Sequence, residues 1–331
     1  ARPCSRARVG IEMALVNGLR GLRAQSRAAR LGTRRALFGV LAVGAVACGR
    51  GPSDADRAFE RPLGAVASAD SSARRAARNE RPPGENPFGL PPVTLSATVG
   101  AYVLAPSRAS LEEAFERGPE RQSIAYSGAV LEELGAVESR VRSLTRQRAR
   151  IPNVLIVPIR PGARAEPGRI VLTSRASGSG LVRAIAVGGD PATPRVRYLD
   201  GDGGGENAEE VLSADSFHVL GEAPEPGRSL ACRVDGTVEH LIWLSSAGEL
   251  RVGLGFAGRI RVAPAGSCRV LPLEPRVRPG DRVYVPLLDG FVPASVVAVD
   301  DRVGRVLVDY ELAGKRVQRS VGFTNVALEL P

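Results

Sequence analysis

Six side chains of the types most often used in catalytic and metal sites are spread widely along this chain. They are four cysteines and two histidines, namely Cys4, Cys48, Cys232, Cys268, His218 and His240. A nucleophile must lie within hydrogen-bond reach of its base, and zinc sites use closely spaced ligand pairs. The sequence holds no C-x-x-C, H-E-x-x-H, G-x-S-x-G or phosphate-cradling glycine loop. We therefore expect no catalytic residue, no metal and no cofactor.

One acidic segment has carboxylates at calcium-like spacing. Asp200, Asp202 and Glu206 alternate with glycines, but the distal bidentate glutamate of a full calcium loop is missing. A solvated hairpin turn is the favoured interpretation, and a weak calcium site is the alternative.

The net charge of +10, from 45 Lys+Arg and 35 Asp+Glu, is concentrated at the N-terminus. Residues 1–47 hold nine arginines and one glutamate, a net of +8, which leaves +2 for residues 48–331. Basicity is thus a poor argument for nucleic-acid binding by the rest of the chain. A hydrophobic content of 44% excludes wholesale disorder, and the absence of any apolar run near 20 residues excludes a multi-pass membrane protein.

The leader, residues 1–47, has the layout of a secretory signal. A basic stretch ends at Arg34–Arg35, twelve uncharged apolar residues follow at 36–47, and Cys48 comes next. The run 45–48 (AVAC) resembles a bacterial lipobox, although that pattern prefers leucine where this chain has Ala45. The run 33–38 (TRRALF) is similar to a twin-arginine export motif. Met13 is a candidate translation start.

The lipobox resemblance implies that Cys48 is acylated and becomes the mature N-terminus. The protein is then an exported, membrane-anchored lipoprotein, periplasmic or on the outer surface, and which membrane holds the lipid is left open. The alternative is a buried apolar helix preceded by a disordered basic arm.

The segment that follows predicts a disordered tether over 48–97, because it has few bulky apolar side chains to offset the cost of ordering. A small helical region with flanking strands is expected over 98–160. Ser110 can cap a short helix that ends near Gly118–Pro119. A second helix over 130–144 is indicated by apolar residues at spacings of 4-3-4-3, namely Val130, Leu134, Val137, Val141 and Leu144. It would pack on its own domain or act as a weak oligomerisation helix.

The remaining sequence has an all-β texture and repeats itself. Pro-Gly followed by an apolar pair occurs at 167–168, 226–227 and 279–280, at intervals of 59 and 53 residues. Each copy continues with short alternating strands, which predicts three β units at 167–220, 226–272 and 279–331. The fold class is therefore mainly β.

The unit resembles the SH3-like barrels of the Tudor and Agenet families. The likeness rests on the opening PG-x-x-V, on a second strand after a Gly-aromatic turn (289–294, DGFVPA), and on a third strand ending in 198–202 (YLDGD). It covers about half the chain and implies three tandem small barrels.

Two further expectations follow from this resemblance. Tudor-like barrels often hold a ligand in a cage of aromatic faces, and only the third unit has enough rings, Tyr284, Phe291, Tyr310 and Phe323. These rings are a candidate binding surface, or they simply fill a small core. First and last strands are neighbours in such barrels, which places Cys232 beside Cys268; a disulfide is expected, with two independent buried thiols as the alternative.

The sequence therefore predicts a non-catalytic cell-envelope lipoprotein that binds or scaffolds through tandem barrels. Its partners are a membrane, through the lipid on Cys48, and an envelope protein, peptide or glycan. A cytoplasmic nucleic-acid- or protein-binding repeat protein is the first alternative, for which the only dense basic cluster is Lys315, Arg316 and Arg319. An envelope hydrolase is the second.

Overall fold

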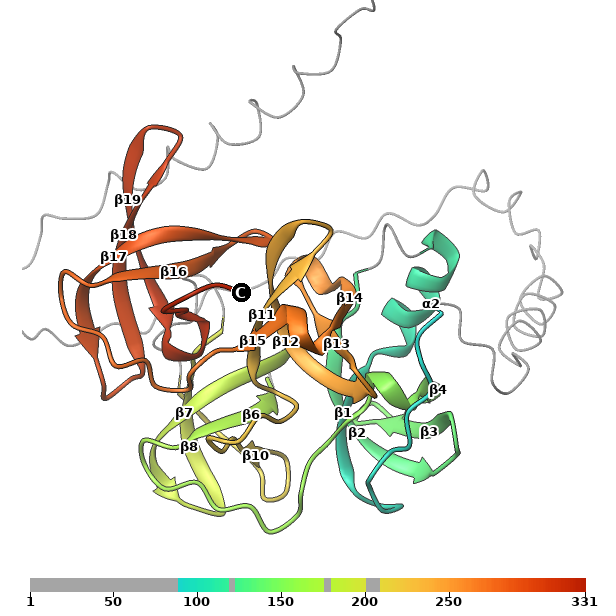
Figure 1. Cartoon of the computed structure of the whole chain (residues 1–331). Helices are drawn as coiled ribbons and strands as arrows, with labels where there is room; N and C mark the ends of the chain where they lie inside the picture. Colours follow the sequence, from blue (N-terminus) through green and yellow to red (C-terminus); the bar gives the residue numbers. More distant parts are fainter. Residues whose placement is uncertain (1–88, 119–122, 176–179, 201–208) are drawn as a thin grey trace, which may run out of the picture. The chain divides into compact units, whose positions relative to one another are not determined.

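A computed structural model describes residues 89–118, 123–175, 180–200 and 209–331 of the chain. These residues form a mainly β structure with three antiparallel sheets (Figure 1). The leader, Cys48 and the tether as far as residue 88 lie outside the described residues.

The first sheet has the strand order β4-β3-β2-β1-β5 and carries one α-helix. Its elements are β1 (Tyr102–Pro106), α2 (Arg108–Arg117), β2 (Tyr126–Glu133), β3 (Glu138–Ser143), β4 (Arg148–Pro152), the 3₁₀ turn η3 (Asn153–Leu155) and β5 (Val157–Pro158). The second sheet has the order β10-β6-β7-β8-β9. Its strands are β6 (Ile170–Ser174), β7 (Leu181–Asp190), β8 (Thr193–Tyr198), β9 (Glu209–Val211) and β10 (His218–Val219).

The third sheet has nine strands, in two groups joined by one bridge between Glu239 and Gly290. The first group is β11 (Ser229–Val234), β12 (Thr237–Ala247), β13 (Leu250–Leu254), η4 (Phe256–Gly258), β14 (Ile260–Pro264), η5 (Ala265–Ser267) and β15 (Cys268–Val270). The second group is β16 (Arg282–Leu287), β17 (Gly290–Asp300), β18 (Arg305–Leu312), β19 (Lys315–Gly322) and η6 (Phe323–Asn325).

One strand order occurs four times, in residues 102–158, 170–219, 229–270 and 282–327, which we call repeats 1 to 4. In repeats 1 to 3 the fourth, third, second, first and fifth strands follow one another across the sheet. In repeat 4 the fifth strand is reduced to a bridge between Tyr284 and Ala327. Within the described ranges no sheet closes on itself in its hydrogen-bond pattern, so the closed barrels implied by the resemblance are replaced by open sheets.

A glycine turn packed against a β-bulge is common to all four repeats. Each second strand has a register shift opposite the third strand. A glycine with φ between 90° and 96° opens each repeat, and its N–H donates to the carbonyl of the residue just before the bulge: Gly100 to Leu131, Gly168 to Ala186, Gly227 to Trp243 and Gly280 to Val296. Residues with a side chain rarely adopt such a backbone φ, which explains the glycine of the Pro-Gly signature. The bulge bends the second strand at this point.

Repeat 1 corrects the sequence interpretation of 98–160. Its opening glycine, Gly100, follows Val99 rather than a proline, so that the signature is incomplete. The helix predicted to end near Gly118 is present as α2. Its N-cap is Ser107 rather than Ser110, and the Ser107 hydroxyl oxygen accepts a hydrogen bond from the Ser110 N–H.

The second predicted helix, over 130–144, is wrong, because these residues form the β2–β3 hairpin. Leu131 and Val141 are buried as cross-strand partners, whereas Leu134 and Leu144 are exposed. A Cβ at Gly135 would lie 2.1 Å from the Glu138 carbonyl oxygen, so the tight turn requires glycine. The apolar spacing is helical only because a bulge and a turn interrupt the alternation. The oligomerisation helix expected here is therefore absent.

The cores cross the boundaries between repeats. The largest apolar cluster joins residues of repeats 1, 2 and 3, including Leu104, Leu172 and Leu244, while repeat 4 has a separate core around Val283, Val306 and Val326. Leu90 and Leu95 are also buried in the large cluster, although they belong to the end of the predicted tether. Chain entry into repeat 1 is thus packed from about residue 90 onward.

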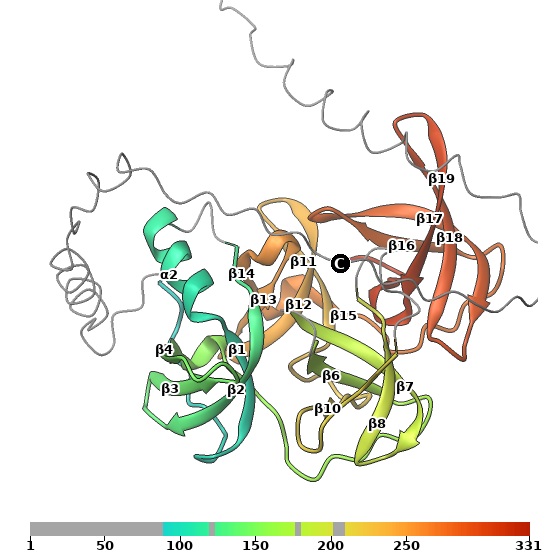
Figure 2. The ribbon, with the colours of Figure 1, turned by 180° about the vertical axis from the view of Figure 1, so that it is seen from behind.

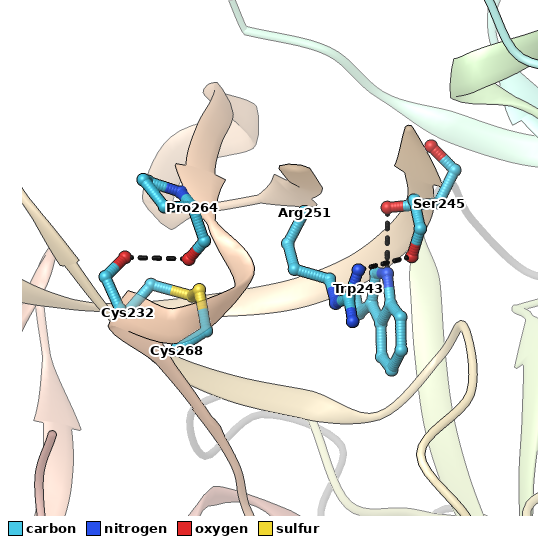
Figure 3. Close-up of a disulfide and its surroundings, with 8 residues drawn as sticks. Cys232, Trp243, Ser245, Arg251, Pro264 and Cys268 are labelled. Carbon is cyan, nitrogen blue, oxygen red and sulfur yellow. Dashed lines mark hydrogen bonds between the residues drawn. A yellow bond between two sulfur atoms is a disulfide. The ribbon is translucent and has the colours of Figure 1, made fainter. Parts of the chain in front are cut away.

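The predicted disulfide between Cys232 and Cys268 is present and links β11 to β15 (Figure 3). Cys232 is fully buried beside Trp243, whose indole N–H donates to the Ser245 carbonyl at 2.8 Å. The guanidinium of Arg251 lies over the Trp243 ring at 4.8 Å. On the chain-entropy model, closing a loop of this length adds about 3–4 kcal/mol to stability, which matters for a repeat with so small a core.

Candidate functional site

A fully buried arginine joins three of the four repeats. Arg183, in β7, is 1% exposed and lies in the otherwise apolar sequence LVRAIAV. Its Nε and Nη2 donate to both carboxylate oxygens of Asp200, at 2.8 and 2.6 Å, and its own backbone N–H donates to Asp200 at 2.6 Å. Nη2 also donates to Asn325 of η6 at 2.8 Å, and Nη1 donates to the hydroxyl of Ser229 in β11. We call these residues, together with His240, the arginine hub.

The charges of the hub are matched to its burial. Burial alone would raise the pKa of Asp200, but the charge and hydrogen bonds of Arg183 outweigh it and hold that pKa below its usual range. The Ser229 hydroxyl lies 3.1 Å from Nε2 of His240. Burial, assisted by the charge of Arg183, lowers the pKa of His240 to about 3, so its imidazole is neutral at physiological pH. Phe291 packs edge-on against this ring at 5.8 Å.

Ser229 and His240 have the separation of a nucleophile and its base, which is what the hydrolase alternative needs. The Ser229 side chain is almost fully buried, and its hydroxyl oxygen also accepts a hydrogen bond from the Arg183 guanidinium. The arrangement favours a structural joint, because the Ser229 hydroxyl is buried and already bonded to Arg183.

A groove between repeats 1 and 2, of about 380 Å³, is lined by an unusual number of hydroxyl groups. We call it the hydroxyl groove. Seven of its residues carry hydroxyls, and these are Tyr102, Ser127, Ser143, Thr145, Ser174, Ser213 and Ser216. The others are Gly128, Leu144, Arg175, Glu210, Val211, Leu212 and Ala214. Leu144 and Val211 are 65% and 64% exposed, so the groove also offers two apolar contacts.

The wall from repeat 1 is held by close packing of Tyr102. Its phenol reaches across Gly128, where a Cβ would lie 1.8 Å from the Tyr102 hydroxyl oxygen. That hydroxyl is 3.2 Å from the Ser174 hydroxyl of repeat 2, and burial raises its pKa, so it remains a donor. Glycine at 128 is therefore the condition for the ring to line the groove.

The wall from repeat 2 is tied to the arginine hub. The guanidinium of Arg175 lies 4.9 Å from the centre of the Tyr198 ring and donates to the Asp200 carbonyl at 2.6 Å. The Tyr198 hydroxyl donates to Glu210, whose strand β9 pairs with β8. Asp200 thus bonds Arg183 through its carboxylate and Arg175 through its carbonyl. Asp200 therefore connects the arginine hub to this wall of the hydroxyl groove.

The four predicted aromatic residues do not form one exposed cage. Tyr310 and Phe323 are 7% and 4% exposed and belong to the core of repeat 4. Tyr284 and Phe291 are partly buried against a different cluster, around Ala231, Leu271 and Ala327. The core-filling alternative therefore describes Tyr310 and Phe323, and the other two rings lie where repeats 3 and 4 meet.

Other candidate residues are placed as follows. Asp200, predicted to lie in a solvated turn, is only 14% exposed and pairs with Arg183, while residues 201–208, which include Asp202 and Glu206, lie outside the described part. In the basic cluster Arg316 pairs with Asp309 and Arg319 donates to the Pro286 carbonyl at 2.9 Å. In the described ranges no three His, Cys, Asp or Glu side chains gather as a metal would require. No helix found there is long and apolar enough to cross a membrane.

The hub and the groove were not identified from the sequence. An arginine between apolar neighbours in a predicted strand was the one signal for the hub, since a buried charge must be paired. Comparison with protein-family models finds no match to this sequence, and comparison with curated proteins finds none. The site is therefore interpreted from its chemistry alone.

The hub predicts a pH dependence of stability that belongs to His240. Its folded pKa of about 3 lies below the ordinary value of 6.5, so only the unfolded chain takes up the proton between these values. The contribution of neutral His240 to the free energy of unfolding is fully present above pH 6.5 and is lost as the pH decreases. From pH 7.5 to 5 the free energy of unfolding should drop by about 2 kcal/mol, measured by urea denaturation at each pH. The Asp200 carboxylate titrates below this window.

The variant His240→Gln should remove that drop, because glutamine does not titrate and can still bond to Ser229. The matched control is His218→Gln. It removes the second histidine of the chain, which lies outside the hub, and should leave the drop in stability unchanged. An equal drop in wild type and His240→Gln would contradict the assignment.

Proposed function

We propose that this protein is a non-catalytic binding protein of the bacterial cell envelope, anchored by a lipid on Cys48, whose hydroxyl groove binds a glycan chain. Its repeats are proposed to be open relatives of the SH3-like, Tudor-like unit. The observation that carries the proposal is the lining of the groove, with seven hydroxyls, one guanidinium and one carboxylate around about 380 Å³.

The groove suits a sugar because both are dense in groups that donate and accept hydrogen bonds. Serine, threonine and tyrosine hydroxyls do both, arginine only donates and an ionised glutamate only accepts. The exposed side chains of Leu144 and Val211 offer contacts for the apolar C–H faces of a sugar ring. Binding sites of this kind combine apolar walls with a few fixed polar groups. The close fit of Tyr102 over Gly128 supports a preformed groove.

Two observations support an envelope location. The leader has the basic, apolar and cysteine order of a lipoprotein signal. The Cys232–Cys268 disulfide is of the kind that persists in oxidising compartments and is rare in the cytosol. The disulfide weighs against the alternative of a cytoplasmic nucleic-acid- or protein-binding repeat protein. The ion pair of Arg316 with Asp309, and the hydrogen bond that ties Arg319 to the Pro286 carbonyl, weigh against nucleic acid as well.

The anchor predicts a specific mass. Intact-mass analysis of the membrane fraction should show a chain that begins at Cys48 with two or three acyl groups. The variant Cys48→Ser should be found in the soluble fraction, whereas Cys4→Ser should remain membrane-bound. An unprocessed wild-type chain in the soluble fraction would end the lipoprotein proposal.

Glycan binding can be tested on the exported Cys48→Ser chain with oligomers of β-1,4-linked N-acetylglucosamine, and with a β-1,4-glucan as a second probe. Titration calorimetry should detect binding to at least one of them. The variant Ala214→Trp places a large ring in the groove at an exposed position and should weaken binding at least tenfold.

The matched control is Ala223→Trp, at an exposed position that does not line the groove. It should bind as the unmodified chain does. Absence of binding to both probes, or equal binding by Ala214→Trp, would overturn the proposed ligand class.

A further inference from the structure

A second cleft, of about 300 Å³, runs between helix α2 and the β3–β4 end of the first sheet, and Figure 2 shows the two elements side by side. We call it the edge groove. Its apolar lining is Leu111, Phe115, Ala149 and Pro152. Its charged lining is Arg108, Arg140, Arg148, Arg150, Glu112 and Glu138. It shares no residue with the hydroxyl groove.

One wall of the edge groove is a free sheet edge. Strand β4 ends the first sheet, and β3 is its only partner among the residues that the structure describes. The Ser143 N–H donates to the Gln147 carbonyl, and the Asn153 N–H donates to the Val137 carbonyl. Both bonds continue the register of the β3–β4 pairing at its two ends. Antiparallel pairs alternate between bonded and non-bonded, so the backbone groups of Arg148 and Arg150 point away from β3. No backbone bond to them is found within the described residues.

Four arginines lie on one face of this hairpin. Arg140 is directly opposite Arg150, and Arg142 is directly opposite Arg148. Both are non-bonded pairs, in which side chains come closest, and like charges placed so are destabilising. Nearby carboxylates must therefore offset this repulsion.

The acidic residues of β2 neutralise only part of this face. The bulge between Leu131 and Glu133 brings consecutive carboxylates to the arginines. Glu132 pairs with both Arg142 and Arg148 at 2.8 Å, and Glu133 pairs with Arg140 at 2.9 Å. Arg150 forms no ion pair with any described residue. With Glu138, which lies on the same face of β3, four guanidinium groups thus face three carboxylates, and Arg150 is the one left over.

The opposite side of the edge is apolar. Ala149 and Ile151 point to the core face, and Leu111 and Phe115 of α2 pack on the same cluster. A strand added beside β4 would therefore place alternate side chains among arginines and against apolar groups.

We propose that the edge groove binds an extended acidic peptide segment of another protein, which adds as a strand to β4. The peptide backbone pairs with the outward N–H and C=O groups of Arg148 and Arg150. Its acidic side chains meet the arginine face, and the alternate apolar side chains contact Leu111, Phe115 and Ala149. Main-chain bonds and alternating pockets are the recognition mode of strand addition.

The charge pattern favours this occupant over the chain's own tether. Residues 49–88 contain seven arginines and six acidic residues, so that segment is not acidic. A nucleic acid could meet the arginines but would leave the backbone edge and the apolar lining without partners. The proposal stands apart from the glycan groove and survives if that groove binds nothing.

The test uses the full exported chain and a fluorescein-labelled peptide of alternating glutamate and valine. Fluorescence polarisation should show binding that weakens as salt is added. Two further peptides carry N-methyl groups, one on every glutamate and one on every valine. Only one set of N–H groups can face β4, so one methylated peptide should bind at least tenfold more weakly than the other. Equal binding of the two would overturn strand addition.

One substitution distinguishes an effect of the arginine face on peptide binding from a general effect of net charge. Arg150→Glu should weaken peptide binding at least fivefold, while Arg302→Glu, at an exposed turn of repeat 4 with the same change in charge, should not. Circular dichroism confirms that both variants fold. Equal effects of the two variants, or tight binding of a single-stranded oligonucleotide with no binding of the peptide, would overturn the proposal.

Discussion

The structure depends on the burial of one charged side chain, Arg183. A buried guanidinium is costly unless it is paired and hydrogen-bonded, and here its three nitrogens bond Asp200, Ser229 and Asn325, which come from three different repeats. Removal of either charge of such a pair typically costs about 3–5 kcal/mol, because the other charge is left unpaired. Four small repeats with open sheets bury little apolar surface singly. The hub therefore joins repeat 4, which has a core of its own, to the apolar cluster that repeats 1 to 3 share.

The same residue connects stability to the hydroxyl groove. Asp200 bonds Arg183 through its carboxylate and Arg175 through its carbonyl, and Arg175 lies over Tyr198, which bonds Glu210 in the groove. A change in the hub is therefore transmitted to a groove wall through a chain of direct contacts. No hub residue lines the edge groove, which shares no lining residue with the hydroxyl groove, although both grooves include parts of the β3–β4 hairpin.

Particular residues show what the sequence could and could not predict. Three repeats were found because the Pro-Gly turn places glycine at a positive φ, a requirement of the backbone that is visible in one residue. Repeat 1 was missed because Val99 replaces the proline, and its hairpin was mistaken for a helix because the bulge after Leu131 shifts the alternation. The disulfide was predicted from strand adjacency. Asp200 was expected to be solvated, since its partner is a tertiary contact. The hydroxyl groove combines strands far apart in sequence, which no local pattern encodes, and the edge groove depends on the hairpin that was mistaken for a helix.

The central claim is that the buried hub makes the repeats one cooperative body. Differential scanning calorimetry of the chain with its disulfide intact tests it most directly. We expect a single transition whose calorimetric and van't Hoff enthalpies agree, and we expect Arg183→Met to separate it into two or more transitions. Several transitions in the unmodified chain, or a single unchanged transition in Arg183→Met, would contradict the account.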